Sequence, residues 1–585
     1  MQADTSLPMQ RNEHVKHAQR AAQLLANLRE QGVIAHSVHS DSRQLTPGAL
    51  FLAYPGERDD GRRHLSEAVR AGAAAVLWEA HSFDWSQTPA VVQGLPNIGV
   101  KDLRQLAGPV AADLYEQTAT QAGIEVDRAL DVIAVTGTNG KTSCAVWIAQ
   151  ALALAGRCCG LVGTLGIGHV PALAAGAEGD AVPQISALQP NPNTTPEAVL
   201  WQRSLHDFRK QGMTAVAVEA SSIGLDQGRL NGTRIAVALF TNLSRDHLDY
   251  HADMQQYAQA KRRLFGMPGL QAAVLNLNDA MGCALAAELA GEAASALRII
   301  GYQLHDELAA RSGHAGKAQD AVGAACWMQL HASDLRHTAS GMALQLQCID
   351  ATGQRRTLPV QSRMIGRHNV ENLLGVLGVL LAQGIDLQQA VRCIELLPPV
   401  PGRMQPVSAT PVTAATAAAT AAATASVSQP MVIVDYAHTP DALQQALQAL
   451  RAMAKARSGK LQVLFGCGGD RDQGKRALMG GVAAQLADAI MLTSDNPRSE
   501  APQVILDDIL HGVPPGYPAL QIEVDRALAI QQLIAQAGVR DVLLLAGKGH
   551  ETTQEVAGVR TPFSDLEQAQ RALQQRGQSA QEPHA

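Results

Sequence analysis

The segment LDVIAVTGTNGKTS at residues 130–143 has the composition of a phosphate-binding loop. An apolar run leads into Gly137 and Gly140, and Lys-Thr-Ser then opens a helix that we expect to end at Gly156. The glycines allow backbone N–H groups to point at phosphate oxygens, and the helix N-terminus adds a favourable dipole. Lys141 would neutralise phosphate charge, and the Thr142 hydroxyl would reach Mg²⁺. Although Val135 replaces the first glycine of the strict pattern, the context predicts an ATP-type site.

Other nucleotide-binding classes share such a loop, because motors, switches and transporters also use it. A GTPase would carry an N-K-x-D motif to read guanine, and no lysine of this chain follows an asparagine. The sequence therefore disfavours a GTPase, whereas the loop by itself does not name a reaction.

Two further polar clusters follow predicted strands. Glu219 comes directly after the apolar run TAVAV, and the segment TNLSRDHLDYH at 241–251 carries Asp246, His247, Asp249 and His251. Ligands of α/β sheets bind outside the carboxyl ends of the strands, so these residues are placed to meet phosphate or metal. A capping role for Glu219 and a structural role for the histidines are the alternatives.

These groups need a sheet to position them. Short runs rich in Val, Ile and Leu alternate with longer helical patterns, which is typical of parallel strands buried on both faces. The expected strands are 130–135, 214–218, 235–241, 272–275, 431–434, 461–465, 489–493 and 542–546, with 50–53, 74–78 and 97–100 in a smaller N-terminal unit.

The fold class that follows is α/β with three domains. We expect a small N-terminal domain at 1–125 whose first ~30 residues are an extension, a central ATP-binding domain with a mostly parallel sheet at 126–404, and a C-terminal Rossmann-like domain at 405–585. Residues 170–192 are rich in Ala, Gly and Pro and indicate a break. The Ala/Thr-rich stretch 408–429 is predicted to be a flexible surface loop.

Composition narrows the class of protein further. The 585-residue chain has a net charge of −6, which argues against a nucleic-acid-binding protein. Its eight cysteines form no C-x-x-C pair, so we expect reduced thiols rather than a zinc ribbon or a disulfide framework. No signal-peptide core or membrane-spanning run is visible, and we expect a cytoplasmic monomer.

The order of several motifs makes the sequence similar to a known family. GTNGKTS, VEASSIGLDQGR, TNLSRDHLDYH, GRHNVENLLG, PGRM, VDYAHTPDAL, FGCGGDRDQGKR, SDNPRSE and GKGHE follow one another as in the Mur ligases. The pattern resembles the members that add meso-2,6-diaminopimelate to UDP-N-acetylmuramoyl-L-alanyl-D-glutamate. The similarity runs from about residue 40 to about residue 565 and implies the three-domain fold of that family.

The resemblance also implies an ATP- and Mg²⁺-dependent ligase of peptidoglycan precursor synthesis. ATP would phosphorylate a carboxylate to an acyl phosphate, and the diaminopimelate amine would displace phosphate. Catalytic roles would fall to Lys141, Glu219, His247 and a carbamylated Lys261, with Thr142, Glu219, His247 and the CO₂-derived carbamate as metal ligands. The implied ATP-binding residues are Gly137, Thr138, Asn139, Gly140, Lys141, Thr142, Ser143, Asn369, Asn372, Arg403 and Asp435.

The same resemblance assigns the other two substrates. The UDP-sugar-peptide would contact Ser40, Ser42, Gly56, Glu57, Arg58, Asn193, Thr194, Thr195, Ser221, Gln227 and Arg229. Ile223 and the G-E-R loop depart from the commoner family sequences there. Diaminopimelate would contact Arg471, Asp495, Asn496, Pro497, Arg498, Gly547 and Glu551.

Arg498 carries the specificity prediction. Meso-diaminopimelate has a carboxylate beside an ammonium at its far end, whereas L-lysine has the ammonium alone, and an arginine can hold that carboxylate with two parallel bonds. The rivals are a lysine-adding ligase, a folylpolyglutamate synthase, and a nucleotide-dependent scaffold without catalysis. Asp-Asn-Pro-Arg opposes the first, the N-terminal domain opposes the second, and retention of Lys141, Glu219 and His247 opposes the third.

Overall fold

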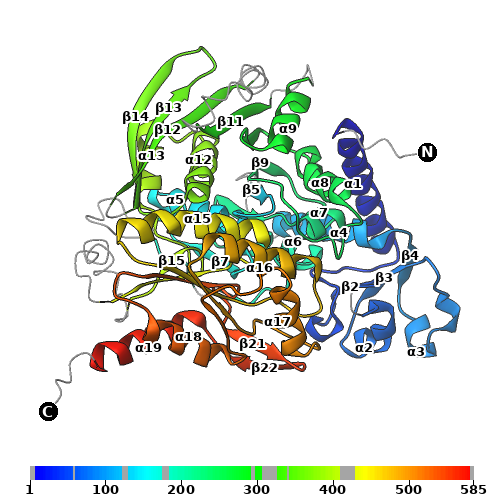
Figure 1. Ribbon diagram of the computed structural model, residues 1–585. Coiled ribbons are helices and arrows are strands. Elements are labelled where there is room, and N and C mark those ends of the chain that lie inside the picture. Colours follow the sequence, from blue (N-terminus) through cyan, green and yellow to red (C-terminus); the bar gives the residue numbers. More distant parts are fainter. Residues whose placement is uncertain are drawn as a thin grey trace.

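The computed structural model describes residues 7–56, 59–121, 130–173, 183–186, 188–291, 297–305, 326–338, 341–408 and 429–579. Three sheets follow one another along the chain, each flanked by helices (Figure 1). The four-stranded sheet lies in the blue N-terminal part, the ten-stranded sheet in the cyan and green part, and the six-stranded sheet in the yellow to red part. The predicted three-domain α/β fold is confirmed.

The N-terminal sheet is parallel, with the order β1 (Val38–His39), β2 (Leu50–Ala53), β3 (Ala75–Glu79) and β4 (Asn97–Val100). Its helices are α2 (Leu65–Arg70), α3 (Ala90–Gln93) and α4 (Leu103–Gln121). The chain begins with a helix of 24 residues, α1 (Leu7–Glu30), for which the sequence indicated no role. Leu24 and Leu25 of α1 join the core that α4 shares, whereas Leu7 lies in a core of the central sheet. Helix α1 therefore packs against both units.

The central sheet has the order β14-β13-β12-β11-β10-β9-β5-β8-β6-β7. Its strands are β5 (Asp131–Thr136), β6 (Cys159–Gly163), β7 (Gly166–Val170), β8 (Ala215–Glu219), β9 (Ile235–Phe240), β10 (Ala272–Asn276), β11 (Arg298–Leu304), β12 (Met328–Thr338), β13 (Gly341–Ile349) and β14 (Arg355–Ser362). The helices are α5 (Lys141–Leu154), α6 (Ala198–Lys210), α7 (Ser222–Asp226), α8 (Met254–Arg262), α9 (Ala280–Gly291), α12 (Arg367–Ala382) and α13 (Leu387–Leu396), and the 3₁₀ turn η4 (Arg263–Gly266) follows α8. Separate apolar cores form on the two faces of the sheet.

The sheet is parallel from β6 to β12, and antiparallel pairing occurs at both edges. The sequence predicted β5, β8, β9 and β10 of this sheet, but not β11, β12–β14 or the β6–β7 hairpin. In β13 buried residues alternate with more exposed ones, because one face of the strand packs on the core, so no continuous apolar run marks it.

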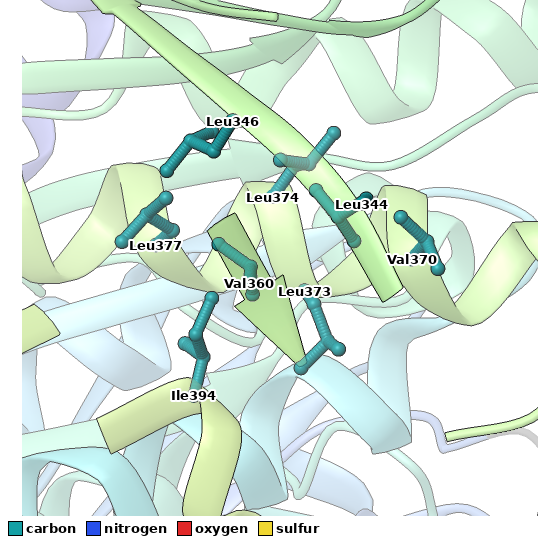
Figure 2. A pocket seen from close by; sticks show the side chains of 8 residues that line it. All are labelled: Leu344, Leu346, Val360, Val370, Leu373, Leu374, Leu377 and Ile394. Atoms are coloured by element: carbon teal, nitrogen blue, oxygen red, sulfur yellow. The ribbon is translucent and has the colours of Figure 1, made fainter. Parts of the chain in front are cut away.

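A small apolar gap lies where this antiparallel edge meets α12 and α13. Figure 2 shows that only aliphatic side chains line it: Leu344, Leu346, Val360, Val370, Leu373, Leu374, Leu377 and Ile394. No polar group points into the gap, so it offers nothing that would orient a ligand, and we interpret it as a packing defect of the core.

The C-terminal sheet has the order β15-β16-β20-β17-β18-β19, and β15 is its antiparallel edge. The strands are β15 (Gln405–Pro406), β16 (Met431–Asp435), β17 (Leu461–Phe465), β18 (Ala489–Leu492), β19 (Leu520–Ile522) and β20 (Val542–Ala546). Helices α15 (Pro440–Ala456), α16 (Gly474–Leu486), α17 (Pro502–Leu510), α18 (Arg526–Gln536) and α19 (Asp565–Ser579) flank it, and β21 (Thr553–Val556) pairs with β22 (Val559–Pro562). Residues 409–428 of the predicted flexible loop lie outside the described part of the chain.

Candidate active site

The phosphate-binding loop has the predicted strand-turn-helix form. Strand β5 ends at Thr136, and α5 begins at Lys141 directly after Gly140. Gly137 and Gly140 have φ angles of 146° and 86°, in the region that side chains disfavour. A side chain at Gly140 would also collide with the amide group of Asn372. The Lys141 ammonium bends back over the loop and donates to the carbonyl oxygens of Gly137 at 2.9 Å and Thr138 at 2.8 Å.

Thr142 and Glu219 meet below this loop. The Thr142 hydroxyl donates to Glu219 Oε2 at 2.9 Å, and the backbone N–H of Thr164 donates to Oε1 at 2.7 Å. A carboxylate beside a hydroxyl is a hard oxygen pair of the kind that Mg²⁺ prefers, with its other ligands supplied by water and phosphate. The residues present therefore fit a magnesium ion. Within the described ranges no group of three or more His, Cys, Asp or Glu forms a preassembled metal cluster.

The segment after β9 brings Asp246 and His247 close to the loop. Asp246 Oδ2 lies 3.6 Å from His247 Nε2, and His247 has a left-handed φ of 54°. Burial would raise the pKa of Asp246, but His247, His438, Lys475 and Lys141 outweigh it and lower the pKa to about 2. Burial lowers the pKa of His247. A carboxylate and a neutral imidazole therefore stand together here at neutral pH.

Lys261 is buried under the phosphate loop, with only 1% of its surface exposed. It comes from α8, and its ammonium donates to the carbonyl oxygen of Gly137 at 2.8 Å. The Nζ atom also lies 4.2 Å from the centre of the Tyr257 ring. Burial, reinforced by the charge of Lys141, lowers the pKa of Lys261 well below its ordinary value. The structure thus places a lysine with an easily lost proton beside the loop.

Arg403, at the end of the central domain, lies between the phosphate-binding loop and the C-terminal domain. Its Nη2 donates to the Thr142 hydroxyl at 3.2 Å, and its guanidinium lies 4.5 Å from the centre of the Tyr436 ring. Asp435 accepts from the backbone N–H groups of Met404 at 2.7 Å and Ala437 at 2.8 Å, so it fixes the turn that carries Arg403. Burial raises the pKa of Asp435.

A pocket between the central and C-terminal sheets opens beside the loop. Of the predicted ATP-binding residues it is lined by Asn139, Gly140, Ser143, Asn369, Asn372, Arg403 and Asp435. The prediction missed His368, Tyr436, His438 and Gln445, which also line it. A signal existed for the first three, since His368 precedes Asn369 and the other two follow Asp435 in the motifs themselves. Asn139 of the loop also donates through Nδ2 to Asp441 Oδ2 of the C-terminal domain, at 3.1 Å.

Two ion pairs cross between the segment after β9 and the loop at 470–473. Arg245 Nη2 lies 3.9 Å from Asp472 Oδ2, and Arg471 Nη1 lies 3.7 Å from Asp249 Oδ2. Each segment contributes one arginine and one aspartate, and the arginine of each segment pairs with the aspartate of the other. Arg471, predicted to bind diaminopimelate, thus pairs with an aspartate of the central domain.

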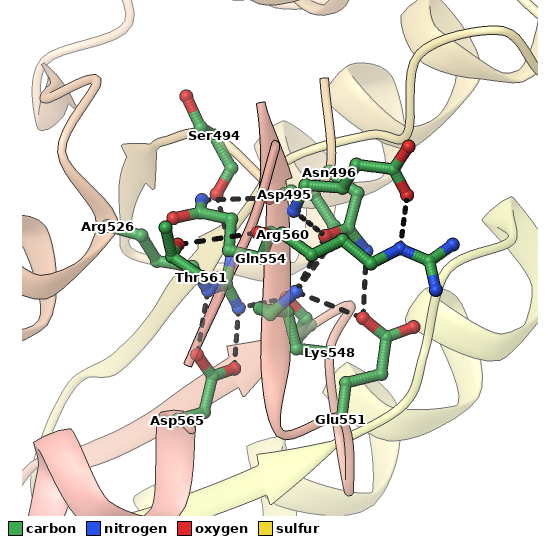
Figure 3. A network of polar contacts seen from close by, with 12 residues as sticks. Ser494, Asp495, Asn496, Arg526, Lys548, Glu551, Gln554, Arg560, Thr561 and Asp565 are labelled. Atoms are coloured by element: carbon green, nitrogen blue, oxygen red, sulfur yellow. Dashed lines mark hydrogen bonds and ion pairs between the residues drawn. The ribbon is translucent and has the colours of Figure 1, made fainter. Parts of the chain in front are cut away.

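The predicted amino-acid site lies at the carboxyl ends of β18 and β20. The Arg498 backbone is held by bonds to the residues of β21 and its turn, and its Nη1 donates to the carbonyl oxygen of Gly469 at 2.6 Å. Asn496 Nδ2 donates to Glu551 Oε2 at 2.8 Å. Gly547, with a φ of 113°, leaves no room for a side chain beside Asp495. Figure 3 shows the polar network that includes Asp495, Asn496 and Glu551.

The residues predicted for the nucleotide-sugar peptide form two groups. In the N-terminal sheet, Ser42 Oγ donates to Glu67 at 2.9 Å, Ser40 hydrogen-bonds Tyr54, and Gly56 N–H donates to the carbonyl oxygen of Asp59. Glu57 and Arg58 lie outside the described residues.

The second group lies directly behind Glu219. Thr195 Oγ1 donates to the Glu219 carbonyl oxygen at 2.7 Å and shares a 2.9 Å bond with Ser221 Oγ. Arg229 donates to the Thr195 carbonyl oxygen at 2.8 Å and to Gln227 Oε1 at 3.0 Å. Thr194 accepts from Thr164, and Asn193 lies beside Asn191. Thr195 thus bonds to the backbone of Glu219, whereas Thr164 links Thr194 to the Glu219 carboxylate.

Comparison with known protein families shows which family has these three domains. The model of the Mur ligase middle domain matches residues 135–380, the Mur ligase glutamate ligase domain matches 421–549, and the Mur ligase family catalytic domain matches 34–134. No described helix is both long and apolar enough to cross a membrane.

Curated relatives match along nearly the whole chain. A UDP-N-acetylmuramoyl-L-alanyl-D-glutamate–2,6-diaminopimelate ligase from Ralstonia nicotianae is 45% identical and covers 97% of this chain and 99% of its own. The enzyme of the same name from Pseudomonas aeruginosa is 42% identical, with 93% and 96% covered. A solved structure of a ligase with that name aligns with a TM-score of 0.58 at 33% identity, over 93% of this chain and 95% of that one. On this identity and coverage, the chain belongs to the Mur ligase family.

Proposed function

We propose that this protein is an ATP-dependent ligase that adds meso-2,6-diaminopimelate to UDP-N-acetylmuramoyl-L-alanyl-D-glutamate in peptidoglycan precursor synthesis. The observation that carries the proposal is the contact of Arg403 with Thr142, together with that of Asn139 with Asp441. The Asn139–Asp441 bond joins the phosphate-binding loop to the domain that bears the Asp495–Arg498 turn, and Arg403 packs on Tyr436 of the same domain. Relatives named for this activity, which are 45% and 42% identical to this chain, support the substrate assignment.

The chemistry follows from the poor reactivity of a carboxylate toward an amine. Transfer of the terminal phosphate of ATP to a carboxylate oxygen gives an acyl phosphate and ADP. The amine nitrogen then bonds to the carbonyl carbon, the C–O bond to phosphate breaks, and the nitrogen loses a proton. Lys141, held over the loop by two carbonyl oxygens, is placed to neutralise charge on the transferring phosphoryl group.

Mg²⁺, when bound, would neutralise phosphate charge and align the phosphoryl group. We assign its protein ligands to Thr142 and Glu219, and a second position to His247 and Lys261. Carbamylation would turn Lys261 into such a ligand: its neutral amine bonds to CO₂, loses a proton and becomes an anionic carbamate. The lowered pKa of Lys261 supports this assignment, because the reaction needs the neutral amine.

We keep the domain limits 1–125, 126–404 and 405–585, since each of the three sheets falls within one of them. The nucleotide end of the substrate would lie on the N-terminal sheet near Ser40, Ser42 and Gly56. The peptide end would lie at Asn193–Thr195, Ser221, Gln227 and Arg229, which adjoin Glu219. This order leads the substrate carboxylate toward the phosphate-binding loop.

The test is phosphate release from ATP in the presence of the muramyl dipeptide nucleotide and diaminopimelate. We expect release to require both co-substrates, and mass analysis of a reaction offered equal diaminopimelate and L-lysine to show the diaminopimelate product. Release with the nucleotide alone would indicate a different acceptor, and a lysine product would indicate the lysine-adding rival.

A further inference from the structure

Lys548 lies at the centre of the amino-acid site but was not among its predicted contacts. Its surface is fully buried, and its ammonium donates to Asn496 Oδ1 and to Glu551 Oε2, each at 3.0 Å. Asp495 Oδ1 lies 3.8 Å away. Since Asn496 also donates to Glu551, the three side chains close a triangle (Figure 3). Lys548 therefore ties the Asp495–Arg498 turn to Glu551.

Lys548 is one cation facing two carboxylates, those of Asp495 and Glu551. The neighbouring Arg526 is fully buried with Asp565, and the two form an ion pair of 2.6 Å. Arg526 also acts on Asp495, against the effect of burial, whereas Lys548 is the cation that pairs with both Asp495 and Glu551. Its charge holds the pKa of Glu551 below the ordinary value against the effect of burial. Loss of the lysine charge would remove the cation that pairs with Glu551 and one of the cations that act on Asp495.

We propose that Lys548 is a positioning residue that sets the preference of this site for an amino acid with a zwitterionic far end over one with a cationic far end. The inference rests on the proposed function and deepens it. Arg498 and Glu551 would contact the substrate, and Lys548 would act through them by fixing Asn496 and Glu551 and by setting the local charge.

The physical argument is electrostatic. The far end of meso-diaminopimelate carries one ammonium and one carboxylate and is neutral overall, whereas the far end of L-lysine carries one positive charge. With Lys548 present, the carboxylates are compensated and Arg498 is available for the substrate carboxylate. Without it, the site becomes more negative by one charge, which favours lysine and repels the substrate carboxylate. Such changes are large where side chains are buried, because water screens them little.

The experiment uses the full chain with Lys548→Gln and Lys548→Met, both of which remove the charge. It measures kcat/KM for meso-diaminopimelate and for L-lysine, and KM for ATP. We expect the ratio of the two kcat/KM values to fall by at least about tenfold, equivalent to ~1.4 kcal/mol, while KM for ATP changes little. Lys548→Arg, which keeps the charge, is expected to keep the ratio close to that of the wild type.

The matched control is Arg457→Met. Arg457 is a partly buried cation of the same domain, but it donates to the carbonyl oxygens of Gln429, Val539 and Arg540, which precede β16 and β20 and so lie at the opposite ends of the strands from the amino-acid site. Loss of that charge is expected to affect stability and leave the substrate ratio unchanged.

Several outcomes would overturn the inference. One is an unchanged ratio in a folded neutral variant, and another is an equal fall of the ratio in Lys548→Arg. If both neutral variants fail to fold while Lys548→Arg is active, Lys548 serves folding rather than specificity. The proposed function fails separately, if the wild type does not ligate diaminopimelate at all.

Discussion

Lys141 and Lys261 donate to the same atom, the carbonyl oxygen of Gly137, at 2.9 Å and 2.8 Å. Burial lowers the pKa of both ammonium groups, and the charge of Lys141 lowers the pKa of Lys261 further, because two cations this close repel each other. Addition of CO₂ to Lys261 would change this repulsion into attraction, because the carbamate is an anion beside the Lys141 cation. The geometry thus gives a physical reason for carbamylation at Lys261 rather than at Lys141, whose charge the phosphates need.

The first prediction concerns this carbamate. Lys261→Ala is expected to lower kcat by about 10²–10³-fold, the range found when one preorganised group that stabilises transition-state charge is removed. Added short carboxylic acids should restore part of the activity by occupying the place of the carbamate. Steady-state assays with and without acetate check this, and intact mass of the wild type in bicarbonate should show one added CO₂.

A suitable control is Lys455→Ala, since Lys455 lies in the last turn of α15 on an exposed part of the C-terminal domain. This variant should keep wild-type activity. Full activity of Lys261→Ala without any added acid would refute the metal-binding role of the carbamate.

The second prediction concerns Arg498. Arg498→Ala should lower kcat/KM for meso-diaminopimelate by orders of magnitude, because a bidentate bond to the far carboxylate would be lost. ATP binding should remain nearly intact, since Arg498 bonds to Gly469 and lies outside the nucleotide pocket. Arg498→Lys should remain impaired, because an ammonium lacks the planar fork. The specificity argument is wrong if the steady-state rate of Arg498→Ala equals that of the wild type.

The third prediction concerns Arg403, which lies between the phosphate-binding loop and the C-terminal domain. Arg403→Ala removes the bond to Thr142 and the packing on Tyr436. Hydrogen bonds of charged groups contribute ~1.5–3 kcal/mol, so the dissociation constant for an ATP analogue should rise by about 10–100-fold. Isothermal calorimetry measures it. Arg451→Ala, which breaks an ion pair with Asp488 within the C-terminal domain, should bind normally. Equal affinities of the wild type and Arg403→Ala would contradict the assigned role.

The sequence predicted most of the parallel strands and the residues that follow them, but it missed β6, β11 and β19. Strands such as β5 and β20 are buried on both faces and are therefore continuous apolar runs, and the polar motifs begin where those runs end. Gly137 and Gly140 mark the phosphate loop for the same local reason, because their backbone conformation requires glycine.

These local sequence patterns did not predict contacts between residues that are distant in the sequence. Asn139 bonds to Asp441, which lies 302 positions away, and nothing local in either segment indicates the other. The role of Lys548 was hidden in the same way, since its partners are brought together by β18 and β20. The strands β13 and β14 were missed because only one of their faces is buried.

The fourth prediction concerns the crossed ion pairs. Arg245→Asp places a second aspartate opposite Asp472. The repulsion between the two carboxylates should weaken the contact between the central and C-terminal domains. Exposed ion pairs contribute at most about 1 kcal/mol, so KM for ATP should rise by no more than roughly fivefold. The exchange Arg245→Asp with Asp472→Arg should restore the wild-type value. If the exchange variant behaves like the single variant, the pair does not hold the domains.

The last prediction concerns pH. Burial lowers the pKa of His368 to about 4, below its ordinary value of 6.5. Between pH 6.5 and pH 4 this histidine is protonated in the unfolded chain but neutral in the folded protein. The free energy of unfolding therefore decreases as pH falls below 6.5. At pH 5.5 this amounts to about 1 kcal/mol for one such histidine. His368→Gln should therefore lose less stability than the wild type between pH 7 and pH 5.5. Urea unfolding at the two pH values measures the difference, and equal losses in both proteins would show that His368 accepts its proton without unfolding.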